Sequence, residues 1–492
     1  MMPGPTIFEK GRRGAGGQHT AGAGLQPGDV AIPAHLLRRT LPDLPELSEL
    51  DVVRHYTRLS RMNMAVDTNF YPLGSCTMKY NPRACEAAAD LPGFRNLTPW
   101  LDRLPQGERY VQGALELLYR LEQMLCAVTG MSAFSLQPMA GANGELTGVL
   151  IMAAYHRRQG NRKTHIIIPD SAHGTNPASA RLAGYEVISV PSDESGCMDM
   201  REFRKVLNSE TAGVMLTVPN TLGVFNPRIP EIAELVHGVD GLMYYDGANL
   251  NALLGWCKPA ELGFDICHLN LHKTFGTPHG GGGPGSGPVG VRHDLECFLP
   301  GPAVARIEGE GYRLRERGEW AIGRIAPFHG NFAVLVKAYS YLLLIGRDGL
   351  RSVSGAAVLH ANYVLERLKD RYPPAVPGRC MHECVLSGRD LKRYGVRTLD
   401  VAKALIDRGF HPPTIYFPLI VPEALMIEPT ESESKETLDG FCEAMREIAD
   451  LAAADAEEIK AAPRHTVVGR LDEVAAARRM EVTASSGTYV GM

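Results

Sequence analysis

The residue most able to do chemistry in this sequence is Lys273, which directly follows a short apolar run. Residues 266–271 are predicted to form a buried strand, with His272 just before the lysine and a glycine-rich stretch, residues 280–287, close behind it. A lysine at the end of a buried strand is costly unless it has a chemical role. The usual role is to form an imine, because a partly desolvated amine is nucleophilic near neutral pH. A surface lysine before a loop is the competing interpretation.

A second strand end carries an acidic residue. Asp246 closes the apolar run at residues 241–245, upstream of Lys273. An acidic residue in this position commonly caps the next helix. Together with Lys273, however, Asp246 predicts pyridoxal phosphate chemistry, which needs a lysine to hold the cofactor and a carboxylate against its pyridine nitrogen. Asp and then Lys, on consecutive strand ends of an alternating αβ pattern, is the order expected in the large aspartate-aminotransferase-like fold.

A loop of small residues upstream of both strands predicts a phosphate site. Residues 136–145 lead into a predicted helix, and Gly141, Ala142 and Asn143 lie where that helix would begin. Free N–H groups at a helix start bind anions, and small residues let a phosphate come close. A turn of this kind is common, so the prediction of a phosphate site depends on Asp246 and Lys273 downstream of the loop.

A polar turn after a β-branched strand carries His173. The strand is predicted at residues 164–168, and the turn continues to Pro177. In this class of fold an aromatic ring from such a position stacks on the cofactor, and we expect His173 to do so. The alternative is a helix-capping turn with an incidental histidine.

With these motifs in place, the chain resembles the glycine cleavage system P-protein family, glycine dehydrogenase (decarboxylating), and in particular its two-subunit bacterial form. The resemblance implies pyridoxal phosphate fold type I, pyridoxal 5'-phosphate on Lys273, and decarboxylation of glycine with transfer of the aminomethyl group to the lipoyl arm of H-protein. It runs from about residue 45 to about residue 450. The matching segments are residues 71–82, 137–145, 170–177, 245–254, 268–291, 328–332 and 427–431.

The resemblance also implies partners and further site residues. A chain of 492 residues has no room for the second, degenerate half of the longer single-chain enzymes. We therefore expect a companion P-protein subunit 1, in a heterotetramer with two copies of each chain, with lipoylated H-protein docking transiently. The loop after a predicted strand at residues 214–218 offers Asn220 or Thr221 to the cofactor's phenolic oxygen. His272 or the freed Lys273 could move protons, and the role of Cys76, inside one matching motif, is open.

Two other functions compete with this one. A related fold-type-I enzyme, such as an aminotransferase or cysteine desulfurase, would share these residues up to the substrate pocket, and the motifs at residues 71–82 and 280–288 argue against it. A catalytically silent regulatory subunit would keep the fold without the lysine. The joint presence of Lys273, Asp246 and His173 argues against that function.

Composition favours a soluble enzyme over other classes. The chain is 45% hydrophobic and 22% charged, ordinary values for a globular protein, and its net charge of -4 gives no reason to expect nucleic acid or membrane binding. Cys380 and Cys384 are accompanied by no second cysteine pair, so no metal site is predicted. Without a spanning segment or a secretory signal, we expect a cytoplasmic location. Residues 11–24, rich in Gly, Ala and Arg, are predicted to be a flexible arm.

The order of predicted elements gives an α/β fold with three regions. Residues 1–90 form an N-terminal arm, residues 91–330 a large domain with a mostly parallel, seven-stranded type of sheet, and residues 331–492 a linking helix and a smaller α+β domain. The linking helix is expected near residues 330–350. The predicted strands are residues 164–168, 186–190, 214–218, 242–245, 266–271 and 424–427, and the predicted C-terminal helices are residues 401–408 and 435–454.

Overall fold

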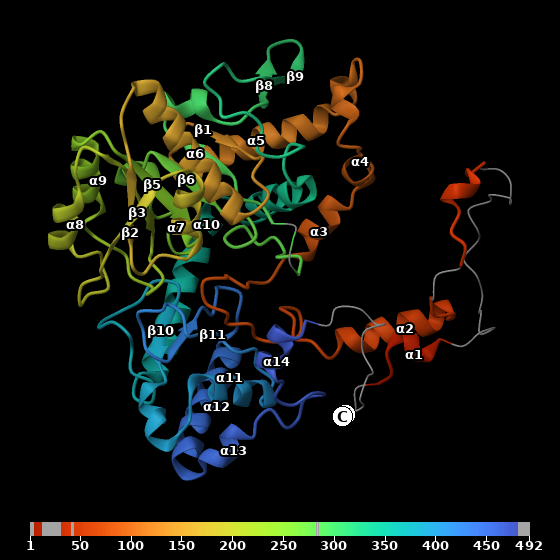
Figure 1. Cartoon of the computed structure of the whole chain (residues 1–492), viewed down its shortest axis with the longest axis vertical. Coiled ribbons are helices and arrows are strands. Elements are labelled where there is room, and N and C mark those ends of the chain that lie inside the picture. Colours follow the sequence, from red (N-terminus) through yellow and green to blue (C-terminus); the bar gives the residue numbers. More distant parts are fainter. Residues whose placement is uncertain (1–3, 12–30, 41–43, 282, 284, 481–492) are drawn as a thin grey trace.

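The computed structural model describes residues 4–11, 31–40, 44–281, 283 and 285–480. Its upper lobe in Figure 1 is built on a seven-stranded sheet in the order β1-β7-β6-β5-β4-β2-β3. In this sheet β7 runs antiparallel and the other six strands are parallel, so the predicted fold class is confirmed. The strands are β1 (Ala133–Ser135), β2 (His165–Pro169), β3 (Glu186–Val190), β4 (Thr211–Thr217), β5 (Leu242–Gly247), β6 (Ile266–Leu269) and β7 (Val289–Val291).

The central strands are buried on both faces, which explains their nearly continuous apolar sequence. In β5, Met243 and Tyr245 join the core on one face of the sheet, whereas Leu242 and Tyr244 join the core on the other. Successive side chains of a strand point to opposite faces, so helices must cover both sides. The covering helices are α5 (Gln112–Thr129), α6 (Gly141–Gln159), α7 (Thr175–Leu182), α8 (Met200–Val206) and α9 (Ile229–Gly238).

The predicted strands agree with the structure except at their ends. Residues 186–190 coincide with β3, and residues 164–168, 214–218 and 242–245 overlap β2, β4 and β5. The prediction of residues 266–271 is too long, because β6 ends at Leu269. From Asn270 the chain turns back on itself, since the backbone N–H of Lys273 donates to the Asn270 carbonyl at 3.1 Å.

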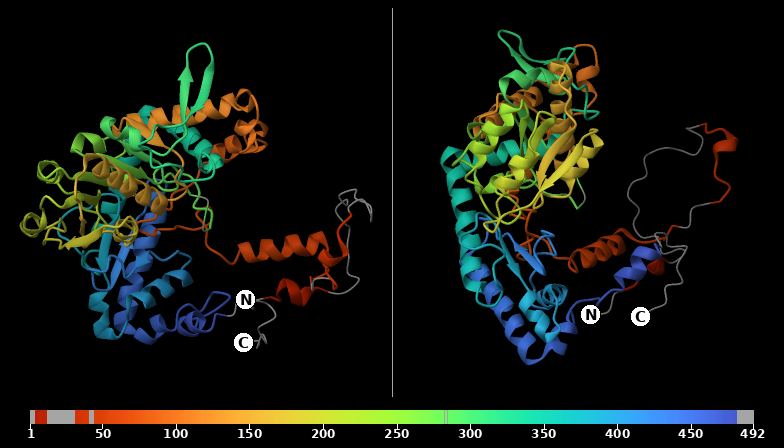
Figure 2. Two further views of the ribbon diagram at one scale, coloured as in Figure 1. Left: turned by 45° about the horizontal axis from the view of Figure 1, so that its top comes forward. Right: turned by 60° about the vertical axis from the view of Figure 1, so that its left-hand side comes forward.

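The lower lobe holds a three-stranded antiparallel sheet, β10-β12-β11, covered by helices. Residues 424–427 and 435–454 were predicted with their observed ends, and residues 401–408 overlap α11. The long helix α10 (Phe332–Leu368) runs from the upper lobe into the lower one (Figure 2). The elements are β10 (Cys384–Ser387), α11 (Thr398–Asp407), β11 (Thr414–Ile415), β12 (Ala424–Ile427), α12 (Lys435–Ala454), α13 (Ala456–Lys460) and α14 (Glu473–Arg478).

The helix predicted near residues 330–350 extends further than expected. Gly346 interrupts α10 with a non-helical φ of 61° and ψ of -177°, yet helical geometry resumes and continues to Leu368. Glycine reaches this conformation without the steric cost that a side chain would bring. The antiparallel pair β8 (Ala303–Ile307) and β9 (Gly311–Arg315) precedes α10 as a separate hairpin.

The N-terminal residues that the structure describes project away from both lobes (Figures 1 and 2). They include α1 (Ile7–Lys10) and α2 (Glu49–Ser60), whereas most of the predicted flexible arm at residues 11–24 lies outside the described residues. The chain then returns to the lobes, where Leu73 bridges to Ile427, and continues into α3 (Arg83–Ala89) and α4 (Pro92–Arg95). No helix in the described part of the chain is long and apolar enough to cross a membrane.

Short 3-10 helices complete the connections between these elements. They are η1 (Ala34–Leu36), η2 (Leu101–Arg103), η3 (Gly107–Tyr110), η4 (Leu250–Ala252), η5 (Pro259–Leu262), η6 (His293–Phe298) and η7 (Arg389–Tyr394).

Candidate functional site

Four neighbouring strands of the large sheet deliver candidate residues to one place. His173 follows β2, Thr217 closes β4, Asp246 lies near the end of β5, and Lys273 lies in the turn after β6. Parallel strands end at the same edge of a sheet, which is where such folds bind ligands. The strand ends enclose a cavity of about 180 Å³. Its lining is Ser75, Gly141, Ala142, Glu145, His173, Thr175, Thr217, Thr221, Asp246, Ala248, Asn270, His272 and Lys273.

Two of the predicted site residues, Asn143 and Asn220, are not among those that line this cavity. The Asn143 side chain accepts a hydrogen bond from the Met139 backbone N–H at 3.0 Å and so shapes the loop before α6. The Asn220 side chain is also used within its own turn, where its Oδ1 accepts from the Val224 backbone N–H at 3.0 Å. Of the pair left open by the sequence, Thr221 is in the lining of the cavity, where its hydroxyl donates to the Ser171 carbonyl. The other predicted residues that line it are Lys273, Asp246, His173, His272, Gly141 and Ala142.

Asp246 is a buried carboxylate with several hydrogen-bond donors. Its Oδ2 accepts from the Asn176 amide at 2.9 Å and from the Thr217 hydroxyl at 3.1 Å, and its Oδ1 accepts from the Ala248 backbone N–H at 3.0 Å. Its side chain is nearly inaccessible to solvent. A carboxylate with this many donors is fixed in place and can be buried in its charged form. The competing interpretation of Asp246, that it caps the next helix, would explain its contact with Ala248 but not those with Asn176 and Thr217.

His268 supports Asp246 from behind. The two residues are opposite each other in the register of β5 and β6, and His268 Nε2 lies 3.4 Å from Asp246 Oδ1. Burial lowers the pKa of His268, so the ring is neutral. Its Nδ1 is 2.8 Å from the Tyr244 hydroxyl, and a hydroxyl that donates there leaves the proton on Nε2, the nitrogen near Asp246, although no hydrogen bond joins the two in the described structure.

The start of α6 forms an anion cradle at one end of the cavity. No side chain caps this helix, and Gly141 and Ala142 in its first turn line the cavity. A Cβ atom added at Gly141 would lie 2.7 Å from Asn270 Oδ1, so this position needs glycine. Exposed N–H groups at a helix start carry a partial positive charge that favours phosphate or carboxylate groups.

Lys273 and His272 also line the cavity, and both are half-buried. Burial and the nearby Lys273 lower the pKa of His272 to about 3, so its ring is neutral at physiological pH. Its Nδ1 accepts a weak hydrogen bond from the Ser286 backbone N–H at 3.3 Å, and a Cβ at Gly285 would lie 3.0 Å from the ring. The described end of the glycine-rich loop therefore packs against His272.

Sequence analysis missed several residues of the site. Glu145, Thr175, Thr217 and Ser75 line the cavity, although none was given a role. The sequence did contain a clue to Glu145, because it is the one acidic residue in the loop and helix start at residues 136–145. Burial and the charge of Asp246 raise the pKa of Glu145 to about 8.

A buried cluster below the cavity joins the two lobes. Glu383 and Glu428 accept hydrogen bonds from the backbone N–H groups of Ser75 and Thr77, at 2.8 and 2.9 Å. Burial raises the pKa of Glu428 to about 7, and burial together with Glu428 raises that of Glu383. Each glutamate therefore holds one backbone group of the loop at residues 75–77.

Together with His382, the two glutamates form a group of described residues that could hold a metal ion. One ligand atom from each of His382, Glu383 and Glu428 lies within 4.8 Å of the others. Burial lowers the pKa of His382 to about 3, so its ring is neutral. Because both carboxylates already accept hydrogen bonds from the loop at residues 75–77, we assign the cluster to holding that loop.

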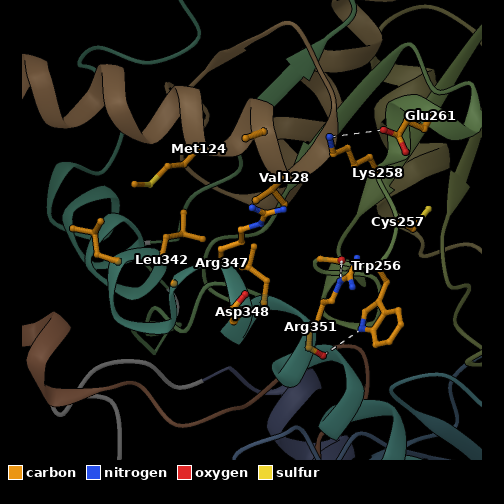
Figure 3. A pocket seen from close by; sticks show the side chains of 15 residues that line it. Met124, Val128, Trp256, Cys257, Lys258, Glu261, Leu342, Arg347, Asp348 and Arg351 are labelled. Carbon is orange, nitrogen blue, oxygen red and sulfur yellow. Dashed lines mark hydrogen bonds and ion pairs between the residues drawn. The ribbon is translucent and has the colours of Figure 1, made fainter.

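A larger cavity, of about 870 Å³, lies away from this chemistry (Figure 3). It opens between α5, the turn at residues 255–258 and α10, next to the interruption at Gly346. In its wall the Trp256 indole N–H donates to the Arg351 carbonyl at 3.2 Å, and Lys258 is 3.7 Å from Glu261. Size alone would select this cavity, but none of the predicted site residues lines it.

The mostly parallel seven-stranded sheet, with a cavity at its strand ends, has the architecture called fold type I. A solved glycine decarboxylase (P-protein) of the glycine cleavage system, in inhibitor-bound form, has the same fold with a TM-score of 0.68 and 22% identity over 86% of this chain and 93% of that one. The apo cysteine desulfurase from Thermococcus onnurineus NA1 follows with a TM-score of 0.59 and 16% identity over 78% and 95%.

Sequence comparison fixes the family within this class. The model of the glycine cleavage system P-protein matches residues 31–390, and that of the glycine dehydrogenase C-terminal domain matches residues 353–468. The chain belongs to the glycine cleavage system P-protein family, which confirms the resemblance found in the sequence.

Curated relatives named "Probable glycine dehydrogenase (decarboxylating) subunit 2" match over nearly their whole length. The protein of Caldanaerobacter subterraneus subsp. tengcongensis is 57% identical over 454 residues, 92% of each chain. That of Chlorobaculum tepidum is 52% identical over 482 residues, 97% of this chain and 98% of its own. The similarity thus includes both lobes.

Proposed function

We propose that this chain is the cofactor-bearing subunit of glycine dehydrogenase (decarboxylating). It removes carbon dioxide from glycine and transfers the aminomethyl group to the lipoyl arm of H-protein. The observation that carries the proposal is that Lys273 and Asp246 line one cavity together with the uncapped start of α6. The relatives that share the family also carry this activity in their names.

The residues of the cavity fit pyridoxal 5'-phosphate as the cofactor. Gly141 and Ala142 would hold its phosphate, Asp246 its pyridine nitrogen, and Lys273 its aldehyde carbon. His173 offers an aromatic ring, whereas the hydroxyl of Thr221 donates to the Ser171 carbonyl and can only accept a further hydrogen bond. Two buried oxygens of the lining, Glu145 Oε2 and Asn270 Oδ1, have no hydrogen-bond partner among the described residues, as expected where a polar ligand belongs.

The protein groups divide the chemistry between them. The bound cofactor supplies an electron sink for the electrons left when carbon dioxide departs. Asp246, fixed by its three donors, would hold a proton at the ring nitrogen. The Lys273 amine would anchor the cofactor, and as a free amine it could carry a proton within the cavity. His272 is too weak a base to compete, given its pKa of about 3.

The alternative of a cysteine desulfurase needs a reactive thiol beside the lysine. Cys76 is the thiol whose ionisation feels the charge of Lys273, but burial raises its pKa. A buried thiol with a raised pKa is a poor nucleophile. An aminotransferase has no such requirement, so a test with a keto acid separates it from the decarboxylase.

Partners form the second part of the proposal. The name of the relatives, subunit 2, supports a companion subunit, which we place in a heterotetramer with two copies of each chain. The projecting arm is the candidate contact, because Leu50, Val53 and Tyr56 on α2 are each more than half exposed. Such a row of apolar side chains on one projecting helix marks an interaction surface. H-protein would dock at the cavity mouth, and the cytoplasmic location stays a prediction.

The deciding experiment measures exchange of bicarbonate carbon into glycine with lipoylated H-protein. The chain is tested alone, with the companion subunit, and with a keto acid in place of H-protein. We expect exchange that needs both subunits. Full activity of the isolated chain would exclude the two-subunit form, and activity with the keto acid alone would identify an aminotransferase.

A further inference from the structure

One buried acidic group in the cavity has no part in the chemistry described so far. Glu145 lies one turn into α6, and its side chain is only 5% exposed. Its Oε1 is 2.8 Å from the Thr175 hydroxyl oxygen, whereas its Oε2 has no partner among the described residues. Whether Glu145 carries a proton can therefore be inferred from the group to which the Thr175 hydroxyl donates its hydrogen.

The Thr175 hydroxyl lies between two groups that could both accept its proton. One is the Glu145 carboxyl, and the other is His173 Nδ1, which is also 2.8 Å away. A hydroxyl has a single hydrogen to donate, so it can serve one of these groups as donor and must act as acceptor for the other.

The backbone of Thr175 decides between the two arrangements. Its N–H donates to His173 Nδ1 at 3.3 Å, which requires an unprotonated nitrogen there. The nearby hydroxyl must then also donate to Nδ1, because an unprotonated nitrogen has no hydrogen to give. The short contact between Thr175 and Glu145 is a hydrogen bond only if the carboxyl carries the proton.

The surroundings of the two neighbouring carboxyl groups agree with this assignment. Asp246 has three hydrogen-bond donors, and Glu145 has none besides the ambiguous hydroxyl. Asp246 and Lys273 are the charged groups that act on Glu145. Burial and Asp246 outweigh Lys273 and raise the pKa of Glu145 to about 8. At neutral pH a Glu145 carboxyl with this pKa carries its proton.

We propose that Glu145 is a neutral hydrogen-bond donor that acts through Thr175 to fix His173 as its Nε2–H tautomer at the mouth of the cavity. Glu145 is thus a positioning residue. The ring of His173 is held at a set angle, and Nε2–H becomes the one N–H donor of this ring. Its use in the reaction rests on the proposed function, but the protonation of Glu145 does not.

The protonation is tested by infrared difference spectroscopy of the full chain at neutral pH, with and without added pyridoxal 5'-phosphate. Subtracting the spectrum of Glu145→Gln from that of the wild type should leave the C=O band of a protonated carboxyl. Glu116→Gln is the matched control, because Glu116 is an exposed carboxylate paired with Arg120 on α5. A difference spectrum that shows an ionised carboxylate at Glu145 overturns the proposal.

The positioning role is tested by the dissociation constant of pyridoxal 5'-phosphate and by the circular dichroism of the bound cofactor. Glutamine keeps a donor for Thr175, so Glu145→Gln should bind within about threefold of the wild type. Glu145→Ala and Thr175→Val should weaken binding about tenfold or more and change the dichroism, since a buried polar group loses its partner. Thr175→Ser keeps the hydroxyl and should show the cofactor binding and the dichroism of the wild type.

The outcomes separate this proposal from the proposed function. If Glu145→Gln binds as weakly as Glu145→Ala, the carboxylate charge is what matters and the proposal is wrong. If Thr175→Val and Glu145→Ala bind like the wild type, Glu145 has no positioning role. If no variant and no wild-type protein binds the cofactor, the proposed function fails, while the infrared band still decides the protonation of Glu145.

Discussion

Glu383 and Ser75 are 308 positions apart in sequence, yet the Glu383 carboxylate accepts the Ser75 backbone N–H at 2.8 Å. Ser75 lines the cavity that holds Lys273, so this bond ties the lower lobe to one wall of the site. Ser75 also has a positive φ of 65°, a conformation that costs a non-glycine residue roughly 1–2 kcal/mol. The hydrogen bond from Ser75 to Glu383 offsets that cost and keeps Ser75 in the wall of the cavity.

Replacing one of the two acceptor oxygens of Glu383 should disturb the site as well as the fold. In Glu383→Gln, the amide cannot serve both the Ser75 N–H and the Asn249 side chain, which lies 3.4 Å from the other oxygen. We expect a loss of about 1–3 kcal/mol in the free energy of unfolding, together with a higher KM for glycine. The measurements are chemical denaturation and glycine–bicarbonate exchange.

Glu423→Gln is the control for this effect. Glu423 also accepts a backbone N–H, from Thr398 at 2.9 Å, but it does so in the lower lobe and away from Lys273. It should lose stability and keep its KM for glycine. An equal change of KM in both variants would remove the special role of Glu383.

Lys273→Ala should abolish attachment of the cofactor. The amine is the only lysine nitrogen among the groups that line the cavity in the described chain. We expect loss of the visible absorbance of the lysine-linked cofactor and of glycine-dependent exchange. A link to the cofactor that can still be trapped with borohydride in this variant would show that another residue holds it.

Asp246→Asn should slow the reaction while the fold persists. Asparagine keeps the size of the side chain but loses the charge that would hold a proton at the ring nitrogen, and removal of a preorganised electrostatic partner typically costs about 10²-fold or more in rate. Single-turnover release of carbon dioxide measures the step directly. Near-normal turnover would reduce Asp246 to a structural cap for Ala248.

Glu428 should make the stability of the protein depend on pH. Burial raises its pKa from 4.5 to about 7, so the folded state binds a proton more tightly than the unfolded state does. The stabilisation is complete below pH 4.5 and is lost as pH rises towards 7. Between these values, the free energy of unfolding of Glu428→Gln should fall less with rising pH than that of the wild type. Parallel curves would contradict the assigned pKa.

The arm should matter for assembly and not for folding. Val53→Glu together with Tyr56→Glu places charge on the exposed face of α2, where both side chains are more than half accessible. We expect weaker association with the companion subunit in analytical ultracentrifugation, and an unchanged Tm of the isolated chain. Substituting Arg54, another exposed residue of α2, with Lys is the control, and unaltered assembly of the double variant would exclude this contact.

The sequence by itself determined the Lys273 and Asp246 pair, the small-residue loop at Gly141 and the mostly parallel sheet. These features are written in short stretches, because an apolar strand and the residue at its end are neighbours in the chain. The same local patterns fixed β3, β12 and α12 at their observed ends.

Only the tertiary structure decided which side chains meet. It placed Thr221 in the lining of the cavity and Asn220 outside it, where the Asn220 amide is used by its own turn. It brought Glu383 to Ser75 across 308 positions, and it joined Glu145, Thr175 and His173 in one hydrogen-bonded chain. Hydrogen bonds of this kind depend on which strand ends are adjacent and on burial, and neither is contained in a local pattern. The charge of a group such as Glu145 therefore becomes defined only when the chain has folded around it.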